Sequence, residues 1–156
     1  LDWLQNHLWI LSGLYGCVRP FHAVEPYRLE MGAKLVVDGA RDLYAFWGDK
    51  LARAIAPADS NATIVNLASV EYAKAVLTRL ATDATVVTCL FGEGVRNGKP
   101  IQRSTASKKA RGSMVRWMAA NGLEDADRLT EFNIGYRHAP ELSYPGTLVF
   151  INEQML

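Results

Sequence analysis

Apolar positions along this 156-residue chain recur with a helical period in some segments, and alternate or run together in others. Apolar stripes with helical spacing predict helices over residues 2–11, 40–56, 70–80, 106–120 and, in a shorter form, 124–131. Alternating or continuous apolar runs predict strands over residues 27–31, 34–37, 63–67, 84–91, 101–104 and 147–151. Asp38 is the expected N-cap of the second helix, and Asn97-Gly98 predicts a hairpin turn.

This order of segments predicts an α/β (or α+β) fold. The length suits one domain, and a hydrophobic content of 49% is enough to build a core. We therefore expect residues 1–156 to form a single compact domain, with a mixed sheet flanked by helices. No apolar run reaches the roughly 18 residues of a membrane-spanning helix, so no membrane association is expected.

Positive charge is concentrated in one segment, which we call the basic segment, residues 96–116. It holds seven basic residues and no acidic one: Arg96, Lys99, Arg103, Lys108, Lys109, Arg111 and Arg116. The rest of the chain has ten basic and sixteen acidic residues, a net charge of −6. A localised basic stripe on an otherwise acidic protein points to a polyanionic partner, although a solvated helix face is the plainer explanation.

The helix predicted over 106–120 separates these charges from an apolar face. On a helical wheel, the core face holds Ala110, Met114, Trp117 and Met118. The opposite half holds Lys108, Lys109, Gly112 and Arg116, with Arg111 at its edge and Val115 among them. A glycine inside a helix costs about 1 kcal/mol relative to alanine. Close approach of another backbone or of a ligand phosphate is one reason to accept that cost.

A second candidate anion site follows the strand predicted over 63–67. Asn66 ends this strand, and Ser69 precedes the helix that follows. Free N–H groups at a helix N-terminus favour anions. The alternative is that both residues only stabilise the turn.

Carboxylates near unusual motifs are candidates for acid–base chemistry. Glu30 and Glu71 are the catalytic candidates, but together with Asp49 they could equally be ion-pair partners of nearby bases: Arg28, Lys74 and Arg53. No hydrolase, P-loop or dinucleotide-binding signature is present, and the three histidines lack metal-ligand spacing. Cys17 and Cys89 have apolar neighbours and are expected to be free thiols of a reducing cytoplasm. We expect no cofactor and no bound metal.

Four motifs, in this order, resemble the YaaA family of bacterial peroxide-stress proteins: "SGLYGCVRPFHAVEPYRLEMG", "DLYAFWGDKL", "NLASVEYAKAV" and "KKARGSMVRWMAANGL". The resemblance implies a cytoplasmic α/β protein that limits hydrogen peroxide damage linked to free iron, and that binds DNA through a basic cleft. The chain resembles the C-terminal part of the family, which agrees with its start at Leu1. We therefore expect it to be a C-terminal fragment of a longer YaaA-like chain.

Some positions depart from the family pattern. His22 stands where an acid is expected, and Thr105-Ala106 stand where aromatic residues are frequent. The change at Thr105-Ala106 weakens any case for base stacking but leaves phosphate contact intact. The helix-hairpin-helix element that the family uses to bind DNA is not recognisable in this sequence.

The favoured function is therefore a non-enzymatic protein that binds double-stranded DNA, with no stable protein partner implied. Its predicted phosphate contacts are Arg19, Arg28, Asn66, Ser69, Lys108, Lys109, Arg111 and Arg116. The alternative is an enzyme acting on a nucleotide or nucleic acid, with Glu30 or Glu71 as its acid–base group. Direct iron binding is a third possibility, but no His, Cys or carboxylate cluster has usable spacing.

Overall fold

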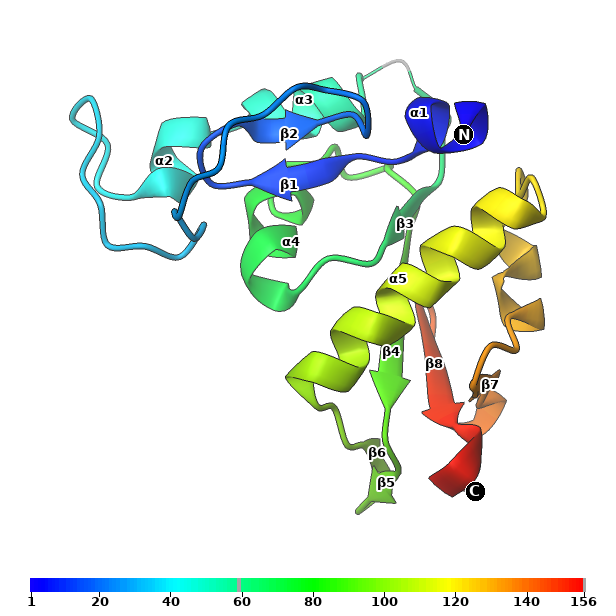
Figure 1. Ribbon diagram of the computed structural model, residues 1–156. Helices are drawn as coiled ribbons and strands as arrows, with labels where there is room; N and C mark the ends of the chain where they lie inside the picture. Colours follow the sequence, from blue (N-terminus) through cyan, green and yellow to red (C-terminus); the bar gives the residue numbers. More distant parts are fainter. Residues whose placement is uncertain (59, 156) are drawn as a thin grey trace. The chain divides into compact units, whose positions relative to one another are not determined.

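The computed structural model describes residues 1–58 and 60–155, and of Met155 it describes the backbone alone. These residues form a mixed α/β structure, as the sequence predicts (Figure 1). They group into two compact units. The first unit comprises residues 1–62 and 68–85, and the second comprises residues 63–67 and 86–156. The expectation that residues 1–156 form one domain stays a prediction.

The second unit is built on a four-stranded mixed sheet with strand order β3-β4-β8-β7. Its strands are β3 (Ile64–Asn66), β4 (Val86–Gly92), β8 (Thr147–Asn152) and β7 (Tyr136–His138). The first three run parallel, and β7 is antiparallel to β8. The predictions for β3, β4 and β8 are confirmed. Each strand was recognisable because a largely continuous apolar run is typical of a buried parallel strand. β7 was missed, since only three residues pair and two of them are polar.

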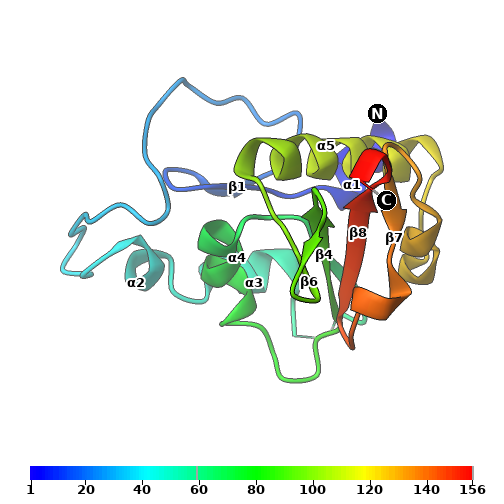
Figure 2. The same cartoon turned by 90° about the horizontal axis from the view of Figure 1, so that it is seen from below.

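Register explains how the two faces of this sheet are covered. Phe91 lies opposite Phe150 in the β4–β8 pair, and their rings stack with centroids 5.4 Å apart. Helix α5 (Ser104–Ala120) lies across β4 in both views (Figures 1 and 2). On the other face, Val149 and Ile151 pack with Ala139, close to the 3-10 helix η2 (Pro140–Leu142). Alternate residues of one strand thus fill two different apolar layers.

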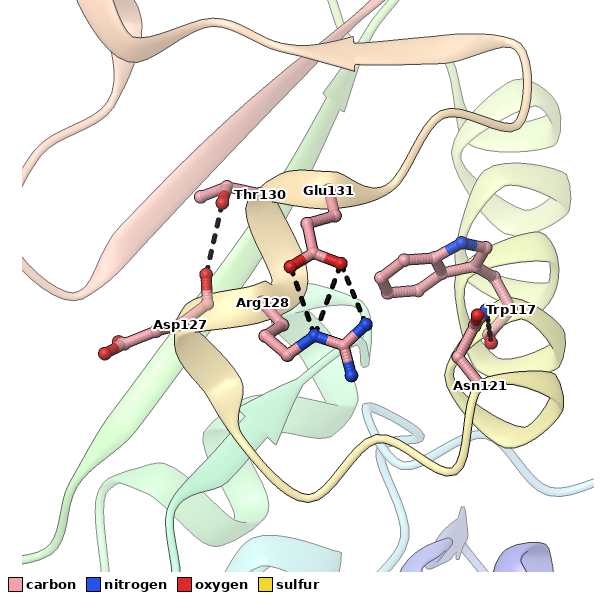
Figure 3. Close-up of polar contacts among 6 residues, drawn as sticks. All are labelled: Trp117, Asn121, Asp127, Arg128, Thr130 and Glu131. Atoms are coloured by element: carbon pink, nitrogen blue, oxygen red, sulfur yellow. Dashed lines mark hydrogen bonds and ion pairs between the residues drawn. The ribbon is translucent and has the colours of Figure 1, made fainter.

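Short elements complete the second unit. Strands β5 (Val95–Arg96) and β6 (Lys99–Pro100) form a hairpin around Asn97 and Gly98, whose φ angles are 51° and 70°. The predicted hairpin turn is confirmed, but residues 101–104 are not its return strand. The segment predicted as a helix over 124–131 is the 3-10 helix η1 (Ala126–Glu131), capped by Asp125. Figure 3 shows Arg128 and Glu131 paired on η1, near Trp117 of α5.

The first unit holds the short antiparallel pair β1 (Ile10–Ser12) and β2 (Gly16–Val18), with four helices. The helices are α1 (Asp2–His7), α2 (Leu43–Trp47), α3 (Lys50–Ile55) and α4 (Val70–Leu77). Its core contains Met31, Leu43, Leu51, Ala75 and Val76. The C-terminal part of the first helix was predicted wrongly, because residues 10–12 instead pair with residues 16–18.

The middle of the first unit differs most from the prediction. Residues 27–31 and 34–37 are not strands, since they find no partner beyond a single bridge between Val37 and Ala40. The helix predicted over 40–56 is two helices, separated where Gly48 adopts a φ of 53°. Asp42, not Asp38, caps α2, and its Oδ1 accepts the Ala45 N–H at 2.8 Å. Asp38 instead occupies a tight turn with a φ of 48°.

The structure contains, within residues 1–58 and 60–155, no helix with the length and apolar composition needed to cross a bilayer.

Candidate nucleic-acid interface

Helix α5 is amphipathic in the way its sequence predicts. Ala110, Met114 and Met118 are buried, whereas Lys108, Lys109, Gly112 and Arg116 are exposed on the opposite side. Trp117 is half-buried and meets the edge of Phe132, with ring centroids 5.7 Å apart. The apolar face of α5 packs against the rest of the second unit. This packing therefore fixes the side of the helix on which Lys108, Lys109 and Arg116 are exposed.

Arg111 differs from its basic neighbours because it is half-buried at the edge of the apolar face. Its Nε has no hydrogen-bond partner among the described residues, and neither does the hydroxyl of buried Ser107. Burial lowers the pKa of the Arg111 guanidinium, since the charged form is desolvated. Arg111 is thus partly a packing residue, while Lys108, Lys109 and Arg116 are purely solvent-facing.

None of the seven cations of the basic segment is neutralised by the described part of the chain. The ion pairs formed there involve other bases, namely Arg41, Arg53 and Arg128. Arg96 and Lys99 lie directly opposite each other in the β5–β6 hairpin, and both are exposed. Like charges in such a cross-strand pair destabilise a hairpin slightly. The basic segment therefore presents unpaired positive charge on two neighbouring elements.

The start of α5 adds neutral donors to this charge. A shallow pocket there is lined by Arg103, Ser104, Thr105, Ala106 and Lys109. Arg103 occupies the N-cap position but provides no side-chain cap, so the first backbone N–H groups of α5 have no side-chain acceptor from it. Sequence reasoning missed Arg103, Ser104 and Thr105 as lining residues. The sequence does carry a signal for them, because the start of this helix lies between Arg103 and Lys108 and has no acidic residue nearby.

Gly112 lies on the exposed face of α5 with open space around it. A Cβ atom built there meets no heavy atom within 4 Å, leaving out the helix's own nearby backbone. Close packing of another described segment therefore does not require this glycine. Access of a ligand to the helix backbone stays the predicted reason for it.

Two predicted phosphate contacts, Arg19 and Arg28, belong to the first unit. They differ in whether the guanidinium group already has partners within the described chain. The Arg19 guanidinium lies 3.6 Å from the ring centroid of Trp9 and donates to the carbonyls of Asn6 and Leu8, at 3.0 and 3.3 Å. Arg28 is exposed and forms no ion pair with any described residue. Arg28 is therefore the more available of the two for a ligand.

Side-chain hydroxyls hold the segment that carries Arg28, although it forms no strand. The Tyr27 hydroxyl hydrogen-bonds Ser12 Oγ, and the Tyr15 hydroxyl accepts the Glu25 N–H at 2.9 Å. Gly13 allows the backbone to approach closely, since a Cβ atom there would lie 2.6 Å from the Leu29 carbonyl oxygen. The unusual residues of this stretch thus tie an extended loop to the β1–β2 hairpin.

Asn66 and Ser69, the residues of the second candidate anion site, belong to different units of the structure. Asn66, in the second unit, ends β3 and donates from Nδ2 to Thr88 Oγ1 at 3.2 Å. Ser69, in the first unit, is the N-cap residue of α4, but its side chain makes no capping bond. Their role in phosphate binding stays a prediction.

Glu30 and Glu71 are not salt-bridge partners of Arg28 and Lys74. A Glu71 carboxylate oxygen accepts the Gly32 N–H at 2.7 Å, and Lys74 lies over the Tyr44 ring instead. Arg53 does pair with Asp49, at 2.5 Å. Burial raises the pKa of the Tyr72 hydroxyl, and the charges of Glu71 and Glu30 raise it further.

A polar cluster at the carboxyl ends of β4 and β8 was missed by the sequence reasoning. The Tyr136 hydroxyl donates to Glu93 Oε1, and Asn152 Nδ2 donates to Glu93 Oε2 at 3.0 Å. Burial raises the pKa of Tyr136 to about 12, and the hydrogen bond to Glu93 acts in the same direction. The cluster ties three strands together through side chains that no sequence motif connects.

Both cysteines are free thiols. Cys89 is buried in β4, and desolvation raises its pKa to about 12. Cys17 is half-buried, and burial raises its pKa despite the nearby Arg19. Neither thiol has the lowered pKa that marks a reactive cysteine. Among the described residues, no three His, Cys, Asp or Glu side chains are grouped so that they could hold a metal ion.

Comparison with known proteins agrees with the motif resemblance. A family model described as Peroxide stress protein YaaA matches residues 1–142. A UPF0246 protein of Desulfitobacterium hafniense is 44% identical over 151 residues, covering 96% of this chain and 59% of that protein. A UPF0246 protein of Laribacter hongkongensis is 46% identical over 158 residues, covering 98% and 60%. The chain thus spans about three fifths of the length of the curated relatives it matches. It belongs to the YaaA (UPF0246) family of peroxide-stress proteins.

Proposed function

We propose that the basic segment binds the phosphate backbone of double-stranded DNA. In this proposal the protein acts in the cytoplasm, during peroxide stress, and helps limit iron-dependent oxidative damage. One observation carries it: seven basic residues lie within residues 96–116, without an acid among them and without an ion-pair partner in the described chain. Four of these cations lie on α5 and two on the β5–β6 hairpin. Unpaired cations grouped in this way are what contact with a polyanion requires.

The residue types favour backbone contact over base recognition. Lys108, Lys109 and Arg116 are exposed on one side of α5, and arginine and lysine both suit phosphate oxygens. Thr105 and Ala106 offer no aromatic ring on which a base could stack. We therefore expect affinity that depends strongly on salt and only weakly on DNA sequence.

Neutralising the exposed cations of α5 tests this proposal. The triple variant Lys108→Gln/Lys109→Gln/Arg116→Gln should bind a fluorescein-labelled duplex at least about tenfold more weakly in fluorescence anisotropy, because several phosphate contacts are lost. Arg111 is left intact because it also packs against the core. The control variant Lys34→Gln/Arg53→Gln/Arg128→Gln removes the same charge from exposed positions, two of them ion-paired. Equal weakening by both variants would show that net charge alone drives binding.

An enzyme acting on a nucleotide or nucleic acid is the second candidate. The observation that favours it is the 2.7 Å hydrogen bond from the Gly32 N–H to Glu71, which joins the Glu71 carboxylate to the loop that carries Glu30. Neither carboxylate forms an ion pair with a described residue. Carboxylates are among the side chains that serve as general acids and bases.

Turnover of nucleotides and oligonucleotides, followed by chromatography, tests the enzymatic alternative. Turnover that is lost in Glu30→Gln, with binding retained, would support it. Glu141→Gln is the control, because Glu141 is an exposed carboxylate of the second unit. A purified protein that converts no substrate of the panel, or Glu30→Gln and Glu71→Gln variants with unchanged turnover, would remove the alternative.

A further inference from the structure

A small polar pocket lies in the first unit, and none of the residues assigned to DNA binding lines it. It is formed by the start of α2 and the last turn of α4, and its volume is about 130 Å³. Pockets that hold drug-sized ligands measure about 300–1,000 Å³. A water molecule takes up about 30 Å³ of liquid, so this pocket suits a group of only a few heavy atoms.

Three cations and one carboxylate line this pocket: Arg41, Lys74, Arg79 and Asp42. Both Asp42 oxygens already have partners, since Oδ1 accepts the Ala45 N–H and Oδ2 pairs with Arg41 Nε at 3.5 Å. The Arg41 side chain is nevertheless 89% exposed, so its terminal amino groups keep free donors. The lining therefore carries a net positive charge of two, and its one carboxylate, Asp42, caps α2 and pairs with Arg41.

Lys74 of α4 and Arg79, which follows the C-terminal end of α4, provide the remaining donors. The Lys74 ammonium lies 4.7 Å from the ring centroid of Tyr44, a contact that leaves N–H groups available. Arg79 is exposed and forms no ion pair with any described residue. The Thr78 hydroxyl donates to the Lys74 carbonyl and so satisfies one of the open carbonyls at this helix end.

We propose that this pocket is an oxyanion site that takes a single phosphate group through Arg41, Lys74 and Arg79. Two arginines and a lysine can surround a tetrahedral anion, with planar donor forks from the arginines and a mobile point charge from the lysine. The pocket has room for one phosphate group. The phosphate can belong to a free ion, a phosphate monoester or a nucleic-acid backbone. The inference stands apart from the basic segment, because it uses none of its residues.

Titration of the 156-residue chain with inorganic phosphate tests the site. Two-dimensional NMR should show shifts of the Ala45, Thr78 and Arg79 amides that saturate in the millimolar range or below. The variant Lys74→Met/Arg79→Gln should weaken phosphate binding at least about tenfold, because two charge-assisted contacts are lost. Lys34→Gln, an exposed lysine outside the pocket, should change it less than twofold.

A second titration with duplex DNA separates the sources of the phosphate. Saturable shifts at these amides with DNA, lost in Lys74→Met/Arg79→Gln, would support the site with the backbone as ligand. Saturable shifts with inorganic phosphate alone would support it for a small phosphate compound. Linear, non-saturating shifts with both probes, or equal weakening by Lys34→Gln, would mean adventitious ion binding only and overturn the proposal. Wild-type shift mapping keeps the test valid if the double variant fails to fold.

Discussion

Individual basic residues of similar appearance in the sequence have different roles in the structure. Arg19 is held by Trp9 and two carbonyls, and Arg128 is paired with Glu131. Lys108, Lys109 and Arg116 have no such partner within the part of the chain that the structure describes. A sequence identifies charge but not whether that charge is already satisfied, because the satisfying groups come from elsewhere in the chain. Of the eight residues predicted to contact phosphate, Lys108, Lys109 and Arg116 are therefore the ones we select for mutagenesis.

Tyr136 provides a stability prediction for a single side chain. Tyr136→Phe removes the hydrogen bond to the Glu93 carboxylate while the ring, only 9% exposed, keeps its packing. A hydrogen bond to a charged group contributes about 1.5–3 kcal/mol, so the free energy of unfolding in urea should fall by roughly that amount. Tyr144→Phe is the control, because Tyr144 is 59% exposed. Equal and negligible effects of both changes would refute the role of the cluster.

The same residue predicts a pH dependence. The pKa of Tyr136 is raised from 10.0 to about 12 in the folded protein, so the folded state holds this proton more tightly than the unfolded state. Its contribution to stability is complete below about pH 10 and is lost as the pH rises toward 12. Urea unfolding across this range should show a steeper alkaline decline for the wild type than for Tyr136→Phe. Parallel curves would contradict the raised pKa.

At the scale of elements, prediction succeeded where local pattern and tertiary packing agree. Helix α5 was predicted closely, because its apolar stripe is long and its Asn121-Gly122 end is a clear stop signal. Residues 27–37 were predicted as strands, but alternation alone cannot supply a neighbouring strand to pair with. The helix predicted over 40–56 is interrupted at Gly48, which adopts a φ of 53° between α2 and α3. Both of these segments lie in the first unit, whereas the missed strand β7 and the wrongly predicted strand over 101–104 lie in the second.

Gly112 gives a prediction for the element that carries the candidate site. Gly112→Ala should stabilise α5 by about 1 kcal/mol, because the site is helical, lacks a positive φ and has room for a Cβ atom. The same variant should bind duplex DNA more weakly if a phosphate approaches the helix backbone there. Thermal unfolding and anisotropy measure the two effects separately. Higher stability with unchanged DNA affinity would leave Gly112 without a ligand role.

At the scale of the whole molecule, composition and segment order were enough to predict a mixed α/β structure with a helix-flanked sheet. Four ordered motifs were enough to indicate the family. Clusters that depend on long-range folding, such as Glu93 with Tyr136 and Asn152, could not be predicted, since their members are separated by up to 59 residues. The activity of the longer family members remains a proposal for this chain, which spans about three fifths of their length.

The salt dependence of DNA binding tests the central claim most directly. Each phosphate contact contributes about −0.9 to the slope of log Kobs against log salt concentration. The wild-type chain should therefore show a steep slope, and Lys108→Gln/Lys109→Gln/Arg116→Gln should reduce its magnitude by about 2–3. The control variant Lys34→Gln/Arg53→Gln/Arg128→Gln should leave the slope within error of the wild type. A slope near zero for the wild type, or equal slopes for the wild type and the α5 variant, would contradict DNA binding through the basic segment.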